Sequence, residues 1–196
     1  MRDVRRGAAA LLLLCALGCS DNHRAASPIS SSSSPPTVPL ADVPLCEEGN
    51  LNVHAIKDVS VAAAPPGHHP MLFAFANLGT ASCAVEGYPR VQLQGQEVLP
   101  FTIVDGKGGA VSDVQPARIA IPINHEVFVL VDKASCTGTT AVAVGVISLA
   151  VQDAKTGDHL LVPPDPRFVF CGEGDPGSTV YVSPFVDTAV KAAVSK

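Results

Sequence analysis

The sequence contains no tryptophan, only two tyrosines, and none of the short motifs that mark common catalytic sites. A G-x-S-x-G nucleophile elbow, an H-E-x-x-H zinc motif, a phosphate-binding P-loop and an EF-hand spacing are all absent. The glycine-rich residues 105–109 are typical of a hairpin tip rather than of a phosphate cradle. These absences predict a protein that is not an enzyme and that binds no cofactor.

Positive charge is also scarce. Thirteen Lys and Arg residues stand against eighteen Asp and Glu residues, which gives a formal net charge of −5 at pH 7. Removal of residues 1–18 would take away three arginines and one aspartate, so the net charge would move from −5 to −7. A chain of this charge, with no basic patch, is not expected to bind nucleic acid.

The first residues are typical of a secretion signal. Three arginines precede an unbroken apolar run over residues 8–17, which is shorter than the about 20 residues that a membrane-spanning helix needs. The run ends at Gly18 and Cys19, and this ending resembles the cleavage site of bacterial lipoprotein signal peptides. The resemblance implies that residues 1–18 are removed, that Cys19 is acylated, for example with palmitate, and that the protein is anchored at the extracytoplasmic face of the cell membrane.

Residues 19–42 are rich in serine and proline, most strongly over residues 30–36. Such a segment cannot bury enough apolar surface to offset the entropy of ordering it, so we predict a disordered tether, either a plain spacer or one that carries O-linked sugars. The predicted folded domain covers residues 43–187, and a C-terminal tail covers residues 188–196.

Four cysteines remain once Cys15 is lost with the signal peptide and Cys19 is acylated. None of the four lies within the two-to-four-residue spacing of zinc ligands, so we expect disulfides and an oxidising compartment. Strand-like runs at 51–62 and 71–77 predict one hairpin, and runs at 141–152 and 159–170 predict another. Antiparallel folding of the two hairpins pairs Cys46 with Cys83 and Cys136 with Cys171.

Short runs of alternating β-branched residues, separated by glycine or proline, occur along the whole predicted domain, and no segment of it has a helical apolar stripe. The alternation changes phase at Gly145, which indicates a bulge or a strand switch. Seven or more such strands predict an all-β domain, an immunoglobulin-like antiparallel β-sandwich. Residues 73–91 read as a strand, a turn, a cysteine and a second turn. Because residues before proline favour extended geometry, Gly87 must take most of the bend before Tyr88-Pro89, and a positive φ there would make its replacement by valine costly.

A family resemblance rests on the same region. The pattern N-L-G-x-x-x-C-x-x-x-G-Y-P consists here of Asn77, Leu78, Gly79, Cys83, Gly87, Tyr88 and Pro89. With the flanking cysteines and the later Y-V-S-P-F, it resembles the actinobacterial lipoprotein family called domain of unknown function 4232, over residues 46–185. The resemblance implies a β-sandwich, a lipoprotein location and no assigned catalytic residue.

His68 and His69 are the most notable candidate ligands, since adjacent imidazoles can bind copper or nickel when other ligands converge on them. Neighbouring side chains on an extended chain point in opposite directions, however, so a solvated loop is the favoured interpretation. We therefore predict a membrane-anchored binding or structural module of the cell envelope, with an envelope or host component as its partner. The alternative is an envelope metal-handling protein that uses His68 and His69.

Overall fold

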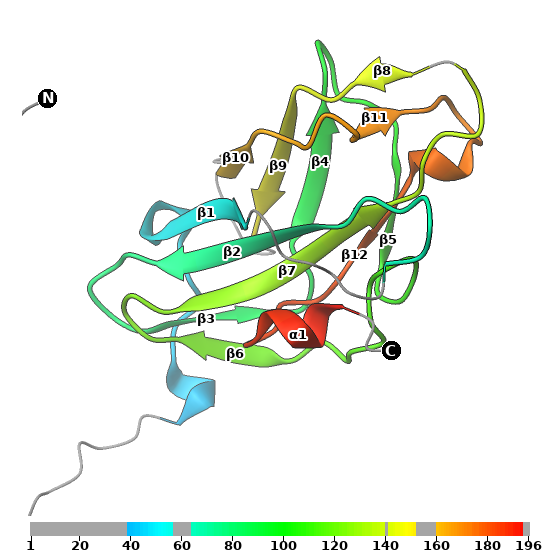
Figure 1. Cartoon of the computed structure of the whole chain (residues 1–196). Helices are drawn as coiled ribbons and strands as arrows, with labels where there is room; N and C mark the ends of the chain where they lie inside the picture. The colour runs from blue at the N-terminus through cyan, green and yellow to red at the C-terminus, as the bar shows by residue number, and fades with distance from the viewer. Residues whose placement is uncertain (1–38, 57–63, 140, 152–159, 194–196) are drawn as a thin grey trace, which may run out of the picture. The chain divides into compact units, whose positions relative to one another are not determined.

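The computed structural model describes residues 39–56, 64–139, 141–151 and 160–193, and the regular secondary structure of this part of the chain is almost entirely strand (Figure 1). A five-stranded sheet has the order β1 (Leu51–Ile56), β2 (Met71–Asn77), β7 (Glu126–Lys133), β12 (Thr179–Val182), β5 (Thr102–Asp105). A three-stranded sheet has the order β10 (Leu160–Val162), β9 (Val146–Ala150), β4 (Arg90–Gln94). Two strand pairs complete the fold, β11 (Val169–Phe170) with β8 (Val142–Ala143) and β3 (Cys83–Glu86) with β6 (Arg118–Ile121). The predicted all-β sandwich class is confirmed.

Helical structure in the described ranges is limited to single turns. These are η1 (Leu40–Asp42), η2 (Glu48–Asn50), η3 (Pro176–Ser178) and α1 (Ala189–Ala192). Within these ranges no helix is long and apolar enough to cross a membrane. Cys19 and most of the predicted tether lie outside the described residues. The first element that the structure describes is η1, and none of its residues is buried.

The main core lies between the five-stranded sheet and the other strands. β2 and β7 contribute alternate residues to it, among them Phe73, Phe75 and Val129, each with an exposed fraction of 0%. β4 and β9 close it from the other side with Leu93 and Leu149. With tryptophan absent, phenylalanine supplies the large side chains: the rings of Phe75 and Phe185 meet edge to face with centroids 5.1 Å apart.

The opposite face of β2 and β7 is also covered. Leu72 and Leu130 project to this side, where they pack with Val186 and with Ala192 of α1 in a second, smaller cluster. Figure 1 shows α1 lying against β7. The residues after 187, which the sequence analysis assigned to a tail, therefore include a helical turn that packs on the domain, because Ala192 is completely buried. The central strand pair is thus buried on both faces.

The two predicted hairpins form with antiparallel pairing. β1 pairs with β2, and Leu51 lies opposite Asn77. β9 pairs with β10, and β8 pairs with β11. The Cα atoms of Cys46 and Cys83 lie 4.8 Å apart and those of Cys136 and Cys171 lie 5.3 Å apart, and each pair is joined by a disulfide. These are the partners that the hairpin argument predicts.

Gly145 separates β8 from β9, so the change of phase in the sequence marks a strand switch between two sheets. One pair departs from the antiparallel prediction: β12 runs parallel to β5, with Thr179 opposite Thr102. A parallel pair needs a long crossover connection, and here the chain that forms β6 to β11 provides it. Turn signals between neighbouring strands cannot reveal such a pair. Residues 57–62 of the predicted strand-like run 51–62 lie outside the described residues.

The region that carries the family resemblance is a set of turn and packing residues. Asn77 is completely buried, and its side chain donates to the carbonyl oxygens of Ala81 and Ile121, both at 2.9 Å, while it accepts from the backbone N–H of Gly79 at 2.9 Å. Gly87 has a φ of 73°, in the left-handed region that favours glycine, and it takes the bend before Tyr88-Pro89. Asn77 therefore fixes the turn after β2 and ties it to the end of β6.

Candidate functional site

A cluster of polar side chains lies next to the start of β2 and the end of β7, where the pairing of the two segments continues past the ends of the strands. The backbone N–H of His69 donates to the carbonyl oxygen of Lys133 at 2.8 Å, and the N–H of Ser135 donates to the carbonyl oxygen of Gly67 at 2.6 Å. An isolated bridge pairs His68 with Ala134 in the same register. Because successive residues of an extended chain face opposite ways, His68 and His69 lie on opposite sides of the sheet.

His68 binds a buried carboxylate on the side of the smaller cluster. Its Nδ1 atom lies 2.7 Å from Oδ2 of Asp132, whose side chain is completely buried. The same oxygen accepts a hydrogen bond from the backbone N–H of Ala110 at 2.8 Å. Gly109 lies directly over this pair, since a Cβ atom built on it would stand 2.7 Å from His68 Nδ1. The glycine-rich loop is therefore a close packing contact for His68 and Asp132, in addition to being a hairpin tip.

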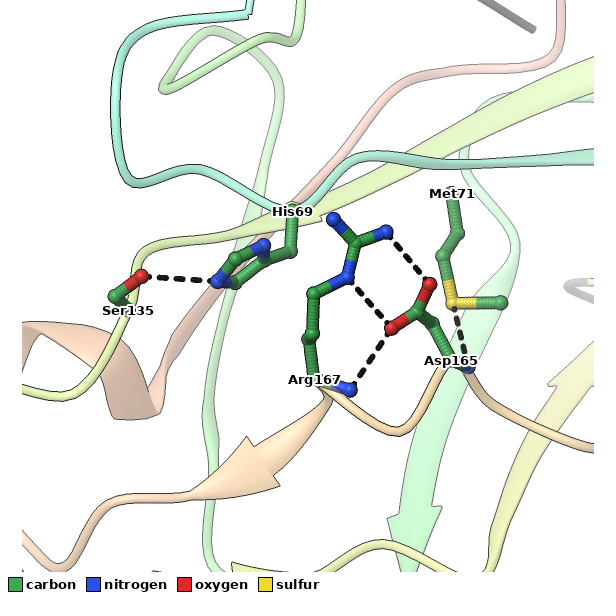
Figure 2. A network of polar contacts seen from close by, with 5 residues as sticks. All are labelled: His69, Met71, Ser135, Asp165 and Arg167. Atoms are coloured by element: carbon green, nitrogen blue, oxygen red, sulfur yellow. Dashed lines mark hydrogen bonds and ion pairs between the residues drawn. The ribbon is translucent and has the colours of Figure 1, made fainter. Parts of the chain in front are cut away.

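His69 binds a serine on the main-core side. Its Nε2 atom and the Oγ atom of Ser135 lie 2.9 Å apart (Figure 2). Its Nδ1 atom is buried without a hydrogen-bond partner among the described residues. Burial lowers the pKa of His69, and the positive charges of Arg167 and Lys133 lower it further. The imidazole is therefore held in its neutral form near neutral pH.

Arg167 and Asp165 form an ion pair beside this imidazole (Figure 2). The guanidinium donates through Nε to one carboxylate oxygen at 2.8 Å and through a terminal nitrogen to the other at 2.7 Å. These hydrogen bonds lower the pKa of Asp165 to about 2. The backbone N–H of Asp165 lies 3.4 Å from Sδ of Met71, so the pair is anchored to the first residue of β2. The side chain of Arg167 is 63% exposed and is available to a ligand.

The chemistry of this cluster is that of a hydrogen-bonding surface. A neutral imidazole next to a serine hydroxyl resembles part of a nucleophilic triad, in which a carboxylate orients the histidine through Nδ1. Here Nδ1 of His69 has no such partner in the described part of the chain, and the carboxylate of Asp165 is occupied by Arg167. The arrangement therefore offers donors and acceptors to a polar ligand without an oriented base.

The structure does not bring the two candidate metal ligands, His68 and His69, together. His68 and His69 face opposite sides of the sheet and have different partners, and within the described ranges no group of three or more His, Cys, Asp or Glu side chains could hold a metal ion. Sequence analysis missed Ser135, Asp132 and the Asp165–Arg167 pair. A register for β2 and β7 would have revealed the first two, because it sets Gly67 opposite Ser135 and places His68 diagonal to Asp132.

A second feature is a partly open cavity of about 310 Å³ next to the Cys46–Cys83 disulfide. Its wall is formed by β3, by the start of β6 and by the residues before it, and is mostly apolar. Arg118 supplies the charge. Its guanidinium donates to Glu86 at 3.0 Å and to the carbonyl oxygen of Val43 at 2.6 Å, while its Nε atom is buried without a partner among the described residues. A concave, mostly apolar wall that also carries an ion pair, here Arg118 with Glu86, is typical of a small-ligand site.

Comparison with protein-family models finds no matching family, and comparisons with curated proteins and with solved structures find no match. The resemblance to domain of unknown function 4232 therefore stays a prediction from the sequence.

Proposed function

We propose that the protein is a lipoprotein of the cell envelope, held at the extracytoplasmic face of the membrane through Cys19, and that it belongs with the domain of unknown function 4232 proteins. Its β-sandwich would act as a binding or structural module rather than as an enzyme. Two disulfides in one domain support an oxidising compartment outside the cytoplasm. The His69–Ser135 pair, which has no carboxylate at Nδ1 among the described residues, supports a non-catalytic role.

The observation that carries the binding role is the cavity beside Arg118. Its volume lies at the lower end of the range of small-ligand sites, and its mainly apolar wall favours a compact, largely apolar ligand or an apolar side chain of a partner. The guanidinium of Arg118 lines the cavity with its side chain 26% exposed, and its terminal nitrogens would donate to an oxygen of that ligand. An envelope or host component with an apolar body and one carbonyl or carboxylate group fits this description.

The anchor is tested by changing Cys19 to alanine in the full chain. Metabolic labelling with a fatty acid should mark the unchanged protein, and the labelled band should vanish in the variant. The variant should also stay uncleaved or be released from the membrane. Unchanged lipid labelling of Cys19→Ala would reject Cys19 as the anchor, and the proposed binding role would not be affected by this result.

The binding role is tested by capture of envelope components on the immobilised protein, with a variant that fills the cavity. Ala117 lines the cavity and is exposed, so Ala117→Phe should block it without disturbing the core. Arg167→Gln, at the separate polar cluster, is the matched control. We expect a captured component that is lost with Ala117→Phe and kept with Arg167→Gln, and equal capture by both variants would reject the cavity as the site.

A copper titration distinguishes the alternative. Binding in the micromolar range that is lost when His68 and His69 are both changed to alanine would replace the proposed role with metal handling. We expect no such binding, because the two imidazoles face opposite sides of the sheet.

A further inference from the structure

Lys133, the last residue of β7, is a lysine whose side chain is completely buried. Its exposed fraction is 0%, although lysine is almost never fully buried unless it is paired. Nζ donates to the carbonyl oxygen of Ala134 at 2.6 Å and lies 3.9 Å from Sγ of Cys171. Burial lowers the pKa of Lys133, and the charges of Asp175 and Asp132 oppose this only in part. The buried amine thus lies beside a disulfide sulfur and has few acceptors for its three N–H donors.

The two disulfides differ in their surroundings. Cys46 and Cys83 are both buried, with exposed fractions of 6% and 8%, and neighbouring backbone hydrogen bonds of 2.8 Å hold the two segments together. Cys136 is only half-buried, and the residues on both sides of it are exposed. Its partner Cys171 is buried, with an exposed fraction of 6%. The second disulfide therefore has one cysteine in a more exposed segment, Cys136, and keeps the sulfur of the other, Cys171, beside the lysine.

Asp175 joins the two ends of this disulfide by a separate route. Its carboxylate accepts hydrogen bonds from the backbone N–H of Thr137 at 3.1 Å, from the Thr137 hydroxyl at 2.7 Å and from the N–H of Gly138 at 3.1 Å. It also accepts from the N–H of Gly177 at 2.8 Å. These bonds connect the loop after Cys136 to η3 without the S–S bond. The two segments should therefore stay together when the disulfide opens, and the bridge should be able to form again.

We propose that Cys136–Cys171 is a thiol-exchange site that accepts electrons from small-molecule or protein thiols, whereas Cys46–Cys83 is a structural bridge. The thiolate of the reductant attacks Sγ of Cys136, a bond forms between these two sulfurs, and the Cys136–Cys171 bond breaks. Its electron pair leaves on Sγ of Cys171. A second thiol group of the reductant then attacks the mixed disulfide and releases Cys136. Two electrons pass to the protein, and the reductant becomes a disulfide.

The position of Lys133 sets this direction of attack. A thiolate that forms on Cys171 would gain the adjacent ammonium as its counter-charge, and the ammonium would gain the acceptor that it lacks in the oxidised protein. A sulfur that leaves as a stabilised thiolate leaves faster and shifts the exchange equilibrium toward the reduced form. The cavity beside Cys46 is lined by no lysine but by Arg118, whose guanidinium donates to Glu86 and to the carbonyl oxygen of Val43.

The test compares the two disulfides within the full chain. The protein is equilibrated with graded ratios of reduced to oxidised glutathione, free thiols are blocked by alkylation, and each cysteine is quantified by peptide mass mapping. We expect Cys136–Cys171 to be half reduced at a thiol ratio on the order of tenfold lower than Cys46–Cys83, and the glutathione adduct to form on Cys136 rather than on Cys171. Reduction of both bridges at the same ratio, or of Cys46–Cys83 first, would overturn the proposal.

A substitution distinguishes the effect of the Lys133 charge from the effect of the greater exposure of Cys136. Lys133→Met keeps the buried length and removes the charge, whereas Lys191→Met removes the charge of an exposed lysine and serves as the control. The quantity compared is the ratio of reduced to oxidised glutathione at which each bridge is half reduced. We expect the difference in this ratio between the two bridges to shrink about tenfold in Lys133→Met and to persist in Lys191→Met. An unchanged difference in Lys133→Met would show that the lysine does not act. If Lys133→Met fails to fold, the comparison of the two bridges in the unchanged protein decides the proposal alone.

Discussion

Replacement of Gly109 by alanine should destabilise the protein strongly, for two separable reasons. The φ of Gly109 is 56°, in the left-handed region, where an L-residue costs roughly 1–2 kcal/mol. The new methyl group would also overlap Oδ2 of Asp132 and stand 2.7 Å from Nδ1 of His68. One hydrogen bond of a buried carboxylate would then be lost or displaced, at a cost of about 1.5–3 kcal/mol. The two effects together predict a loss of about 2.5–5 kcal/mol.

Gly174→Ala is the matched control. Gly174 has a similar φ of 80°, but a Cβ atom built on it meets nothing within 4 Å, so this variant carries the backbone strain alone. Urea denaturation at neutral pH should show a loss of roughly 1–2 kcal/mol for Gly174→Ala. Gly109→Ala should lose at least about twice as much, with a fall in Tm on the order of 10 °C. Equal losses in the two variants would refute the close approach of Gly109 to the His68–Asp132 pair.

Three further outcomes are expected. Gly87→Val, at a φ of 73°, should cost more than about 1 kcal/mol, and an unchanged melting temperature would show that the glycine is not needed for the bend. Joint replacement of Cys46 and Cys83 by alanine should cost about 4 kcal/mol, because the bridge joins residues 37 apart; a loss below about 1 kcal/mol in urea would contradict this. The lowered pKa of Asp165, about 2 against 3.8, stabilises the fold above pH 3.8, and this stabilisation is lost as the pH falls to about 2. Because the Arg167 side chain is 63% exposed and solvent screens the pair, Asp165→Asn should cost about 0.5–1 kcal/mol at pH 7 and almost nothing once the pH is well below 2, and a difference that persists in acid would refute the ion pair as its cause.

The polar cluster shows where sequence reasoning stops. His69 and Ser135 are 66 residues apart, and no local pattern connects them. They meet because β2 and β7 pair in one register, which depends on the burial of Phe73 and Val129 against the opposite sheet. A shift of one residue would move every side chain to the other face, so the partners of a histidine follow from the register of the whole strand pair.

Alternation and turn residues in the sequence were sufficient for the strand class, the two hairpins and the bend at Gly87, because these depend on interactions between residues that are close along the chain. The strand switch at Gly145 was visible for the same reason. Only the tertiary structure placed β5 parallel to β12, covered both faces of the β2–β7 pair, and buried Lys133 beside Cys171. These features depend on contacts between distant segments, whose free energy comes from burying a shared core and is not recorded in any short stretch of sequence.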